Sequence, residues 1–380
     1  MKLPFIINAQ VIINKKNAMK NQKEKFKRKT LFFIGFLILI IVCPALPVRA
    51  TDNKVRAAYE MRLSGEVDEA KTLLEQLVKA DSTNAAAYFE LARTLHHMML
   101  GGSGHKPEDI LPVINKAVDN DPDNVIYAYY LANICFLNAY ASKENSNEYV
   151  VKACNAFKEV LKLKPDYKEA ILSLVEIYGL LPADMGGDKG VAEMYAKSLS
   201  GMDGFYSARA NAVLMEEGAD KVSYWESVTK ENPKCAYAAE ELGKAYFFKD
   251  DIEKGAMYME QAMDLNPENK LPQLNIARAY VMMVMQKKGD KEKNLELAES
   301  AFKAYLDKDP DTIIPLKAYT KGWIAKIKRF TGDEEGSKEF MAEAKALDPY
   351  FSMAFGVPSE YLYSPPDEIS TYFTSYFSPF

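Results

Sequence analysis

The sequence predicts an all-α solenoid, in which about eight helical hairpins stack one on the next. Prolines recur at multiples of 34 residues. Pro233 lies 68 residues after Pro165, and Pro267 lies 34 residues after Pro233. Between them, apolar residues recur every three or four positions, which is the pattern of a helix with one buried face. A hairpin of this length cannot bury such a face alone, so neighbouring hairpins must cover one another.

The clearest hairpin runs from Asn232 to Pro267 and holds two amphipathic runs, separated by a polar turn at residues 249–251. One helical face carries Leu242, Gly243 and Tyr246 in the first run, and Gly255, Met259, Ala262 and Met263 in the second. This hairpin resembles a tetratricopeptide repeat, whose Leu, Gly, Tyr, small residues and closing Pro it shares, although Ala239 replaces a large residue. The resemblance covers about residues 53–349 in eight units and implies a right-handed solenoid.

The other hairpins follow in order. We expect them over residues 53–81, 85–121 and 125–164, twice between 165 and 233, and again over 270–309 and 313–348. Three of them are longer than the repeat, and we expect the extra residues in turns at 100–106, 139–147 and 286–294, which are polar or rich in Gly. Pro107 follows the turn at 100–106 and suits the first turn of the next helix.

Residues 1–50 predict an export signal. Eight Lys or Arg residues between Lys15 and Lys29 precede the apolar run Leu31–Val42, and small residues follow at Val48–Ala50. A run of twelve residues suits a signal-peptide core and falls short of the roughly 20 that span a bilayer. We expect cleavage after Ala50 and a periplasmic, envelope-associated or extracellular location. The alternatives to cleavage are an uncleaved anchor and lipid attachment at Cys43. Met19, just before the basic cluster, is a second candidate for the translation start.

The net charge of the chain argues against a nucleic-acid partner. Without residues 1–50 the chain has 38 basic and 52 acidic residues, a formal net charge of −14. Phosphate backbones repel such a chain, so we expect no nucleic-acid partner.

The cysteines that remain after residue 50 are Cys135, Cys154 and Cys235. Cys135 occupies a buried-type helical position, which favours a core residue over a disulfide with Cys154.

Residues 350–380 differ from the repeats, because they hold ten aromatic residues and no Lys or Arg. Disordered segments are poor in aromatic residues. We expect this tail either to cap the protein's own array or to bind a partner. Its aromatic residues are Tyr350, Phe351, Phe355, Tyr361, Tyr363, Tyr372, Phe373, Tyr376, Phe377 and Phe380.

No catalytic motif stands out, so we expect neither an enzyme nor a cofactor. The stretch Gly186–Lys189 looks like a phosphate loop, but no strand precedes it, so a turn between helices is expected. His96, His97 and His105 are weak candidates for metal ligands, since imidazole binds zinc and copper. Because His96 and His97 point about 100° apart on a helix, we expect no metal site.

The family resemblance also implies a binding surface. In tetratricopeptide arrays, positions two, five, nine, twelve and thirteen of the first helices line a concave groove. The candidates here are Phe89, Arg93, His96, His97, Tyr129, Asn133, Phe136, Tyr237, Lys244, Phe247, Phe248, Leu274 and Arg278. We expect about half of such positions to be buried between units. A clamp for a peptide carboxylate is not favoured, because Phe89 and Tyr129 stand where the family uses Lys.

The predicted function is therefore protein–protein interaction. The chain would act as a non-enzymatic scaffold of the cell envelope or periplasm and hold a partner's segment in the groove. The alternative is a periplasmic solute-binding component that assists a transporter and binds a small apolar ligand. Membrane attachment is expected only through an uncleaved signal.

Overall fold

A computed structural model describes residues 50–142, 144–353 and 360–363. The chain divides into two compact units, Met1–Asn53 and Lys54–Phe380, and the hairpins lie in the second, with the first helix starting just before it. The predicted signal peptide, up to residue 49, and most of the aromatic tail lie outside the described residues. Within the described ranges the chain forms helices and turns and no strand, which confirms the all-α prediction.

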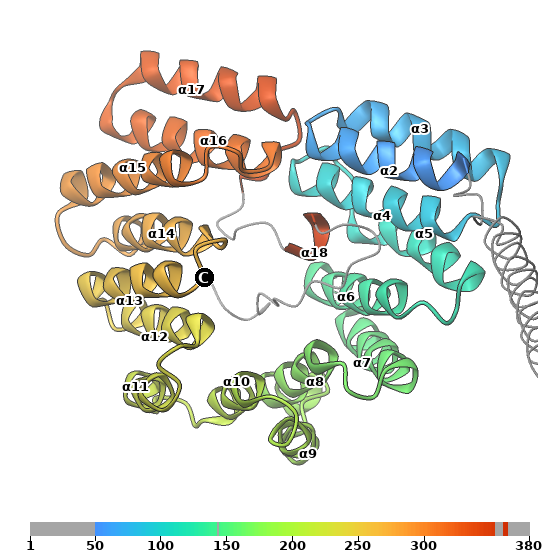
Figure 1. The fold of residues 1–380 in the computed structure, drawn as a ribbon, viewed down its shortest axis with the longest axis horizontal. Coiled ribbons are helices and arrows are strands. Elements are labelled where there is room, and N and C mark those ends of the chain that lie inside the picture. Colours follow the sequence, from blue (N-terminus) through green and yellow to red (C-terminus); the bar gives the residue numbers. More distant parts are fainter. Residues whose placement is uncertain (1–49, 143, 354–359, 364–380) are drawn as a thin grey trace, which may run out of the picture. The chain divides into compact units, whose positions relative to one another are not determined.

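Eight helical hairpins follow one another in these ranges (Figure 1). Their helices are α2 (Ala50–Leu63) with α3 (Val67–Ala80), α4 (Ala85–Leu100) with α5 (Pro107–Asn120), α6 (Val125–Ala141) with α7 (Ser146–Leu163), α8 (Lys168–Leu180) with α9 (Lys189–Leu199), α10 (Gly204–Leu214) with α11 (Lys221–Glu231), α12 (Ala236–Phe248) with α13 (Ile252–Leu265), α14 (Leu271–Met285) with α15 (Lys291–Lys308), and α16 (Ile314–Thr331) with α17 (Glu334–Leu347). A short helix, α18 (Glu360–Tyr363), comes after the last hairpin. The predicted number of hairpins is confirmed.

Asp, Asn and Pro set the borders between hairpins. Asp121 ends α5, and Pro122 cannot continue the helix because proline has no N–H. The side chain of Asn124 then accepts hydrogen bonds from the N–H groups of Ile126 and Tyr127 at 3.1 and 3.3 Å, which starts α6. Asp or Asn side chains also cap the first turn of α4, α9, α10, α11, α13, α15 and α17.

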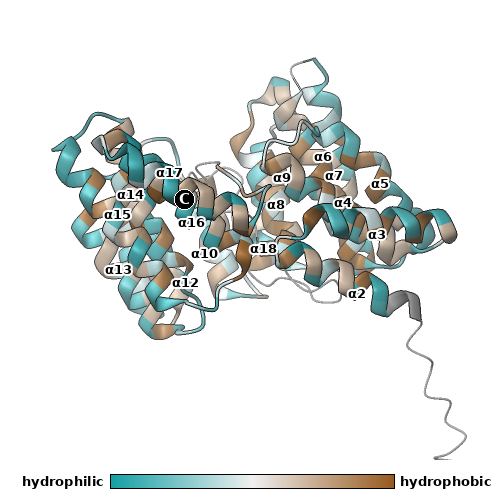
Figure 2. Cartoon of the chain, turned by 90° about the horizontal axis from the view of Figure 1, so that it is seen from above, coloured by the Kyte–Doolittle hydropathy of each residue, from teal (hydrophilic) through white to brown (hydrophobic). Residues whose placement is uncertain are grey.

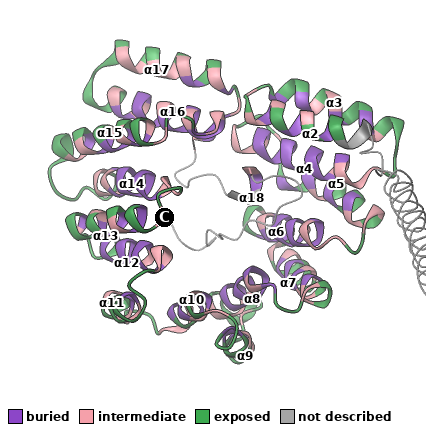
Figure 3. Ribbon diagram, in the orientation of Figure 1, coloured by how far each residue is buried: buried purple, intermediate pink, exposed green. Residues whose placement is uncertain are grey.

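In hairpins two to four and six to eight, a largely buried first helix is paired with an amphipathic second one. For example, α4 buries eleven residues whereas α5 buries four. Figure 3 shows the same contrast between α4 and the outlying α17, on which only Ala344 is buried. Hydrophobic and hydrophilic residues share the amphipathic helices, as Figure 2 shows for α13 and α15. Because neighbours cover them, the first helices hold their side chains in fixed positions.

Two of the three predicted loops are shorter than expected. The turn before Pro107 agrees with the prediction, since α4 ends at Leu100. However, α6 continues to Ala141 and α7 begins at Ser146, so the predicted loop at 139–147 was wrong in extent. Similarly, α15 begins at Lys291, where Asp290 caps it. The extra residues mostly lengthen α6, α7 and α15, because a polar sequence is compatible with the exposed face of a helix.

Within the second unit, the end of the last hairpin contacts the first two hairpins (Figure 1). Nε2 of His97 lies 2.8 Å from Oδ2 of Asp348, and both side chains are buried. The Tyr350 hydroxyl donates a hydrogen bond to Asp68 Oδ1 at 2.9 Å. These contacts join residues that are 251 and 282 positions apart in the sequence, so neither end of the array stands alone.

The three cysteines of the described residues belong to the second unit. Cys135 and Cys154 are buried, Cys235 is half-buried, and all three are free thiols. The expectation that Cys135 belongs to the core is confirmed. In the part of the chain that the structure describes, no helix has both the length and the hydrophobicity to cross a membrane.

Candidate functional site

The thirteen predicted groove residues lie on α4, α6, α12 and α14, the first helices of four hairpins. Phe248 is exposed over 56% of its surface, and Tyr237 is half-buried. The other eleven are buried: Phe89, Arg93, His96, His97, Tyr129, Asn133, Phe136, Lys244, Phe247, Leu274 and Arg278. Burial is therefore more extensive than the expected half.

In hairpin two, these buried residues contact the chain's own helix α18. Nη2 of Arg93 donates a hydrogen bond to the carbonyl oxygen of Leu362 at 2.8 Å. The Tyr59 hydroxyl donates another to the carbonyl oxygen of Tyr363 at 2.9 Å. Leu362 is fully buried. Residues 360–363 thus occupy the inner side of the first two hairpins, where a groove was expected.

The histidines do not converge on one point. Their polar neighbours are Tyr130 for His96 (3.0 Å), Asp348 for His97 (2.8 Å) and Ser103 for His105 (2.7 Å). Across residues 50–142, 144–353 and 360–363, no three His, Cys, Asp or Glu side chains are grouped closely enough to hold a metal ion. The turn at Gly186–Lys189 connects helices, as predicted, and Asp188 caps α9.

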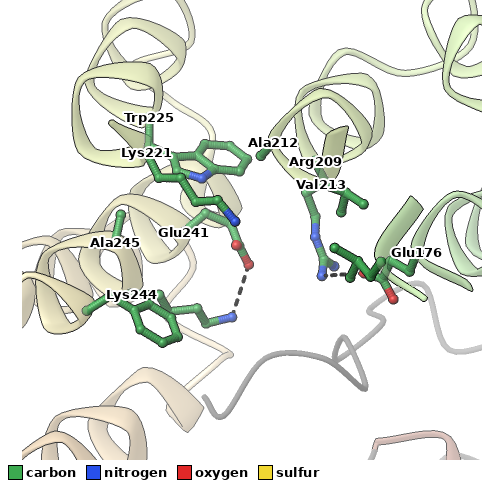
Figure 4. A pocket seen from close by; sticks show the side chains of 11 residues that line it. Glu176, Arg209, Ala212, Val213, Lys221, Trp225, Glu241, Lys244 and Ala245 are labelled. Carbon is green, nitrogen blue, oxygen red and sulfur yellow. Dashed lines mark hydrogen bonds and ion pairs between the residues drawn. The ribbon is translucent and has the colours of Figure 1, made fainter. Parts of the chain in front are cut away.

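A pocket opens farther along the array, between α8, α10, α11 and α12 (Figure 4). Its volume is about 150 Å³. The lining residues are Glu176, Leu180, Arg209, Ala212, Val213, Lys221, Trp225, Glu241, Lys244, Ala245 and Phe248. Two of them, Lys244 and Phe248, belong to the predicted groove. This pocket is our candidate functional site.

Charges of both signs face one another in and beside the pocket. Nζ of Lys244 lies 3.0 Å from Glu241 Oε1 and 3.1 Å from Glu240 Oε1, and Nη2 of Arg209 lies 3.5 Å from Glu176 Oε1. Burial lowers the pKa of Lys244, but Glu240 and Glu241 attract its proton more strongly, so the pKa is raised overall. Burial raises the pKa of Glu241, but Lys244 and Arg209 outweigh it and the pKa is lowered. Both groups are therefore charged at neutral pH.

The rest of the pocket is apolar, with one exposed cation. Trp225 is buried and forms a flat wall beside Ala212, while the exposed ring of Phe248 lies at the rim. Lys221 is exposed and forms no ion pair with any residue that the structure describes. An aromatic wall beside fixed charges suits a ligand group with an apolar body and a polar attachment.

Sequence reasoning missed most of this site. It did not single out Glu176, Arg209, Lys221, Trp225 and Glu241 as binding residues. The available signal was a charge inside an apolar helical run, as for Glu176 in ILSLVEIYGL and Arg209 in FYSARANAV. The repeat pattern is weakest in hairpins five and eight, and inner-face positions were assigned only in hairpins two, three, six and seven.

The comparisons with known proteins concern the fold. The family model described as "Tetratricopeptide repeat" matches residues 236–269, and no curated protein matches. Similar solved structures include TTC0263, a thermophilic TPR protein of Thermus thermophilus, at 18% identity and a TM-score of 0.39, covering 61% of this chain and 100% of that chain. A tetratricopeptide repeat protein from Parabacteroides merdae ATCC 43184 has 14% identity and a TM-score of 0.43, over 77% and 98%. Yeast Tom70 has 13% identity and a TM-score of 0.36, over 89% and 78%.

The matched segment is the same hairpin that the sequence pattern identifies most clearly. It contains α12 and α13, with the Leu, Gly and Tyr positions of the repeat buried as the pattern predicts. The TM-scores of these three structures are all below 0.5. The family model therefore identifies residues 236–269 as a tetratricopeptide repeat.

Proposed function

We propose that this protein is a non-enzymatic interaction scaffold that binds a segment of a partner protein at the pocket between α8, α10, α11 and α12. Proteins with tetratricopeptide repeats generally mediate protein–protein interactions. The observation that carries the proposal is the pocket itself, in which Trp225 lies beside the buried charges of Arg209 and Lys244. Aromatic residues and arginine are the side chains that most often dominate binding energy at interfaces.

The size of the pocket supports a side chain of a partner as its occupant. A cavity of about 150 Å³ is the size known to hold a benzene ring in a protein core. Pockets for drug-sized ligands are larger, about 300–1,000 Å³. The alternative, a solute-binding component that carries a small apolar ligand, therefore has less support from this site than a peptide anchored by one aromatic or aliphatic residue.

We also propose that the protein acts in the periplasm, at the envelope or outside the cell. The support is the order of basic residues, apolar run and small residues within residues 1–50. Fractionation of cells followed by mass spectrometry of the N-terminus tests this directly. A mature protein that begins after Ala50 in the exported fraction would support it, and an intact N-terminus in the cytoplasm would exclude it.

Peptide selection tests the binding site. A library of displayed peptides is selected on the protein, and the affinity of selected peptides is measured by fluorescence anisotropy. The variant Lys221→Glu with Phe248→Glu changes two exposed lining residues, so the fold is preserved. We expect it to weaken binding at least about tenfold, or roughly 1.4 kcal/mol. The matched control is Lys254→Glu on α13 of the same hairpin, where Lys254 is exposed and outside the pocket. Equal affinity for all three proteins would rule out this pocket.

A further inference from the structure

We propose that residues 364–380 of this chain bind in the pocket between α8, α10, α11 and α12 and compete with other occupants. The role of this tail as a competitor rests on the proposed function, whereas its binding in the pocket does not. Three observations support this proposal: the point at which the described residue Tyr363 leaves the array, the number of residues that follow it in the sequence, and the chemistry of the pocket.

The tail starts from a fixed point on the inner side of the array. Leu362 is fully buried, and its carbonyl oxygen accepts a hydrogen bond from Arg93 at 2.8 Å. The carbonyl oxygen of Tyr363 accepts a second hydrogen bond, from the Tyr59 hydroxyl at 2.9 Å. The ring of Tyr363 packs edge-on against the ring of His97, with 5.8 Å between the ring centroids. The chain therefore enters residue 364 from the first helices of hairpins one and two, on the face that carries the pocket residues in later hairpins.

The tail is long enough to reach the pocket. Helix α10 belongs to the hairpin three units after that of α4, and packed helices lie about 10 Å apart, so the path is on the order of 30 Å. Seventeen residues follow Tyr363, and an extended chain of that length spans up to about 56 Å. Tyr372, nine residues after Tyr363, just reaches this distance when the chain is fully extended, whereas Tyr376, Phe377 and Phe380 reach it with length to spare.

The composition of the tail matches the pocket. Residues 364–380 contain five aromatic rings, Asp367 and Glu368, and no Lys or Arg. The pocket offers the ring of Trp225, the exposed ring of Phe248 and the exposed cation of Lys221. An aromatic ring fits a cavity of about 150 Å³. Because the tail contains no Lys or Arg, its two carboxylates keep their negative charge, which is opposite to that of Lys221.

Tethering makes this binding effective even if the tail peptide alone binds weakly. Because the tail belongs to the same chain as the pocket, its effective concentration there is on the order of millimolar. A partner's segment must then displace the tail, so removal of the tail contacts should strengthen partner binding. The outcome is a binding site that stays covered until a tighter occupant arrives.

Photo-crosslinking in the full chain tests the proposal. p-Benzoylphenylalanine replaces Phe377, the protein is irradiated, and cross-linked peptides are mapped by mass spectrometry. We expect cross-links to residues of α8, α10, α11 or α12 within one chain, with a yield independent of protein concentration. The variant Lys221→Glu with Phe248→Glu should lower this yield several-fold. The control probe replaces Phe330, an exposed residue at the end of α16, and should give no cross-link to the pocket.

Three results would overturn the proposal: no cross-link from position 377, cross-links only to other helices, or cross-links only between two chains. The last result would mean that the tail binds a second copy. None of these readouts needs a partner protein. Because the bound tail competes with selected peptides, peptide selection is repeated on a variant in which the tail residues Tyr372, Phe373, Tyr376, Phe377 and Phe380 are replaced by Ser. Pocket cross-links combined with a failed selection on this variant would reject the proposed function alone, and the reverse combination would reject the tail proposal alone.

Discussion

Glu90 is a fully buried carboxylate held between two buried arginines. Its Oε1 accepts a hydrogen bond from Nε of Arg62 at 2.7 Å, and its Oε2 accepts one from Nη1 of Arg93 at 3.2 Å. The two arginines come from α2 and α4, so one carboxylate joins two hairpins. Removing one member of such a group leaves a buried charge without compensation, which costs more than the intact group contributes.

We therefore expect Glu90→Gln to lower the free energy of unfolding by about 3–5 kcal/mol. Urea denaturation followed by circular dichroism measures it. The control is Glu60→Gln, which removes the carboxylate from an exposed pair with Arg56 and should cost less than about 1 kcal/mol. Equal effects of the two substitutions would show that the buried group does not stabilise the fold.

His96 gives the chain a pH-dependent stability. Burial is the main cause that lowers its pKa to about 3, and His97, Arg62 and Arg93 add repulsion in the same direction; the ring also faces the Tyr130 hydroxyl. In the unfolded chain its pKa is about 6.5. Between these values only the unfolded state binds the proton, so stability must fall as pH falls through this window.

The variant His96→Gln isolates this effect, because glutamine can still hydrogen-bond but does not titrate. Between pH 7.5 and pH 5, we expect the wild-type protein to lose about 2 kcal/mol more stability than the variant. Urea unfolding at the two pH values measures both losses. If the two proteins lose the same stability, the His96 ring does not stay neutral in the folded protein.

At the scale of helices, the close crossing of α12 and α13 depends on glycine. A Cβ built on Gly255 would lie 2.3 Å from the Phe247 ring, and one on Gly243 would lie 2.9 Å from the carbonyl oxygen of Gly255. Gly255→Ala should destabilise the protein by about 1–3 kcal/mol, because the ring must shift in a packed core. Thermal or urea unfolding measures the change.

The control for this prediction is Gly190→Ala, in the first turn of α9. Its nearest heavy atom to a new Cβ is a side-chain oxygen of Asp188 at 3.4 Å, so there is room. Alanine favours a helix over glycine by up to about 1 kcal/mol. We expect a neutral or stabilising effect there. Destabilisation of similar size at both positions would contradict a specific role for close packing at Gly255.

Helix borders could be predicted from sequence because they are set locally. Pro122 stops a helix and Asn124 starts one through contacts within a few residues. The ends of α6 and α15 were misplaced, because polar residues suit both a loop and an exposed helical turn. The pocket could not be predicted, because it forms where several helices meet. Lys244 pairs with Glu240 and Glu241 on its own helix, but Arg209 and Glu176 are on different hairpins, and no local pattern records that these two will face each other.

At the scale of the second unit, the contact between its first and last hairpins changes how the array should unfold. In a linear array each repeat touches only its neighbours, so end repeats can unfold first. Here Asp348, after the last hairpin, lies against His97 of the second, and both are buried. The last hairpin therefore receives support from both sides, which should make unfolding more cooperative.

Two tryptophans report on this coupling, because Trp225 lies in the fifth hairpin and Trp323 in the eighth. The variant Trp225→Phe keeps only Trp323, and the variant Trp323→Phe keeps only Trp225. In urea, the fluorescence of the two variants should change at the same midpoint. Adding Asp348→Ala leaves His97 buried without its carboxylate, which should cost about 1–3 kcal/mol. The fluorescence of Trp323 should then change at lower urea than that of Trp225, because the last hairpin loses its second neighbour. Asp307→Ala, which removes an exposed carboxylate of α15, should leave the midpoints together. Coincident midpoints in the Asp348→Ala protein would mean that the neighbouring hairpin alone holds the last one in place.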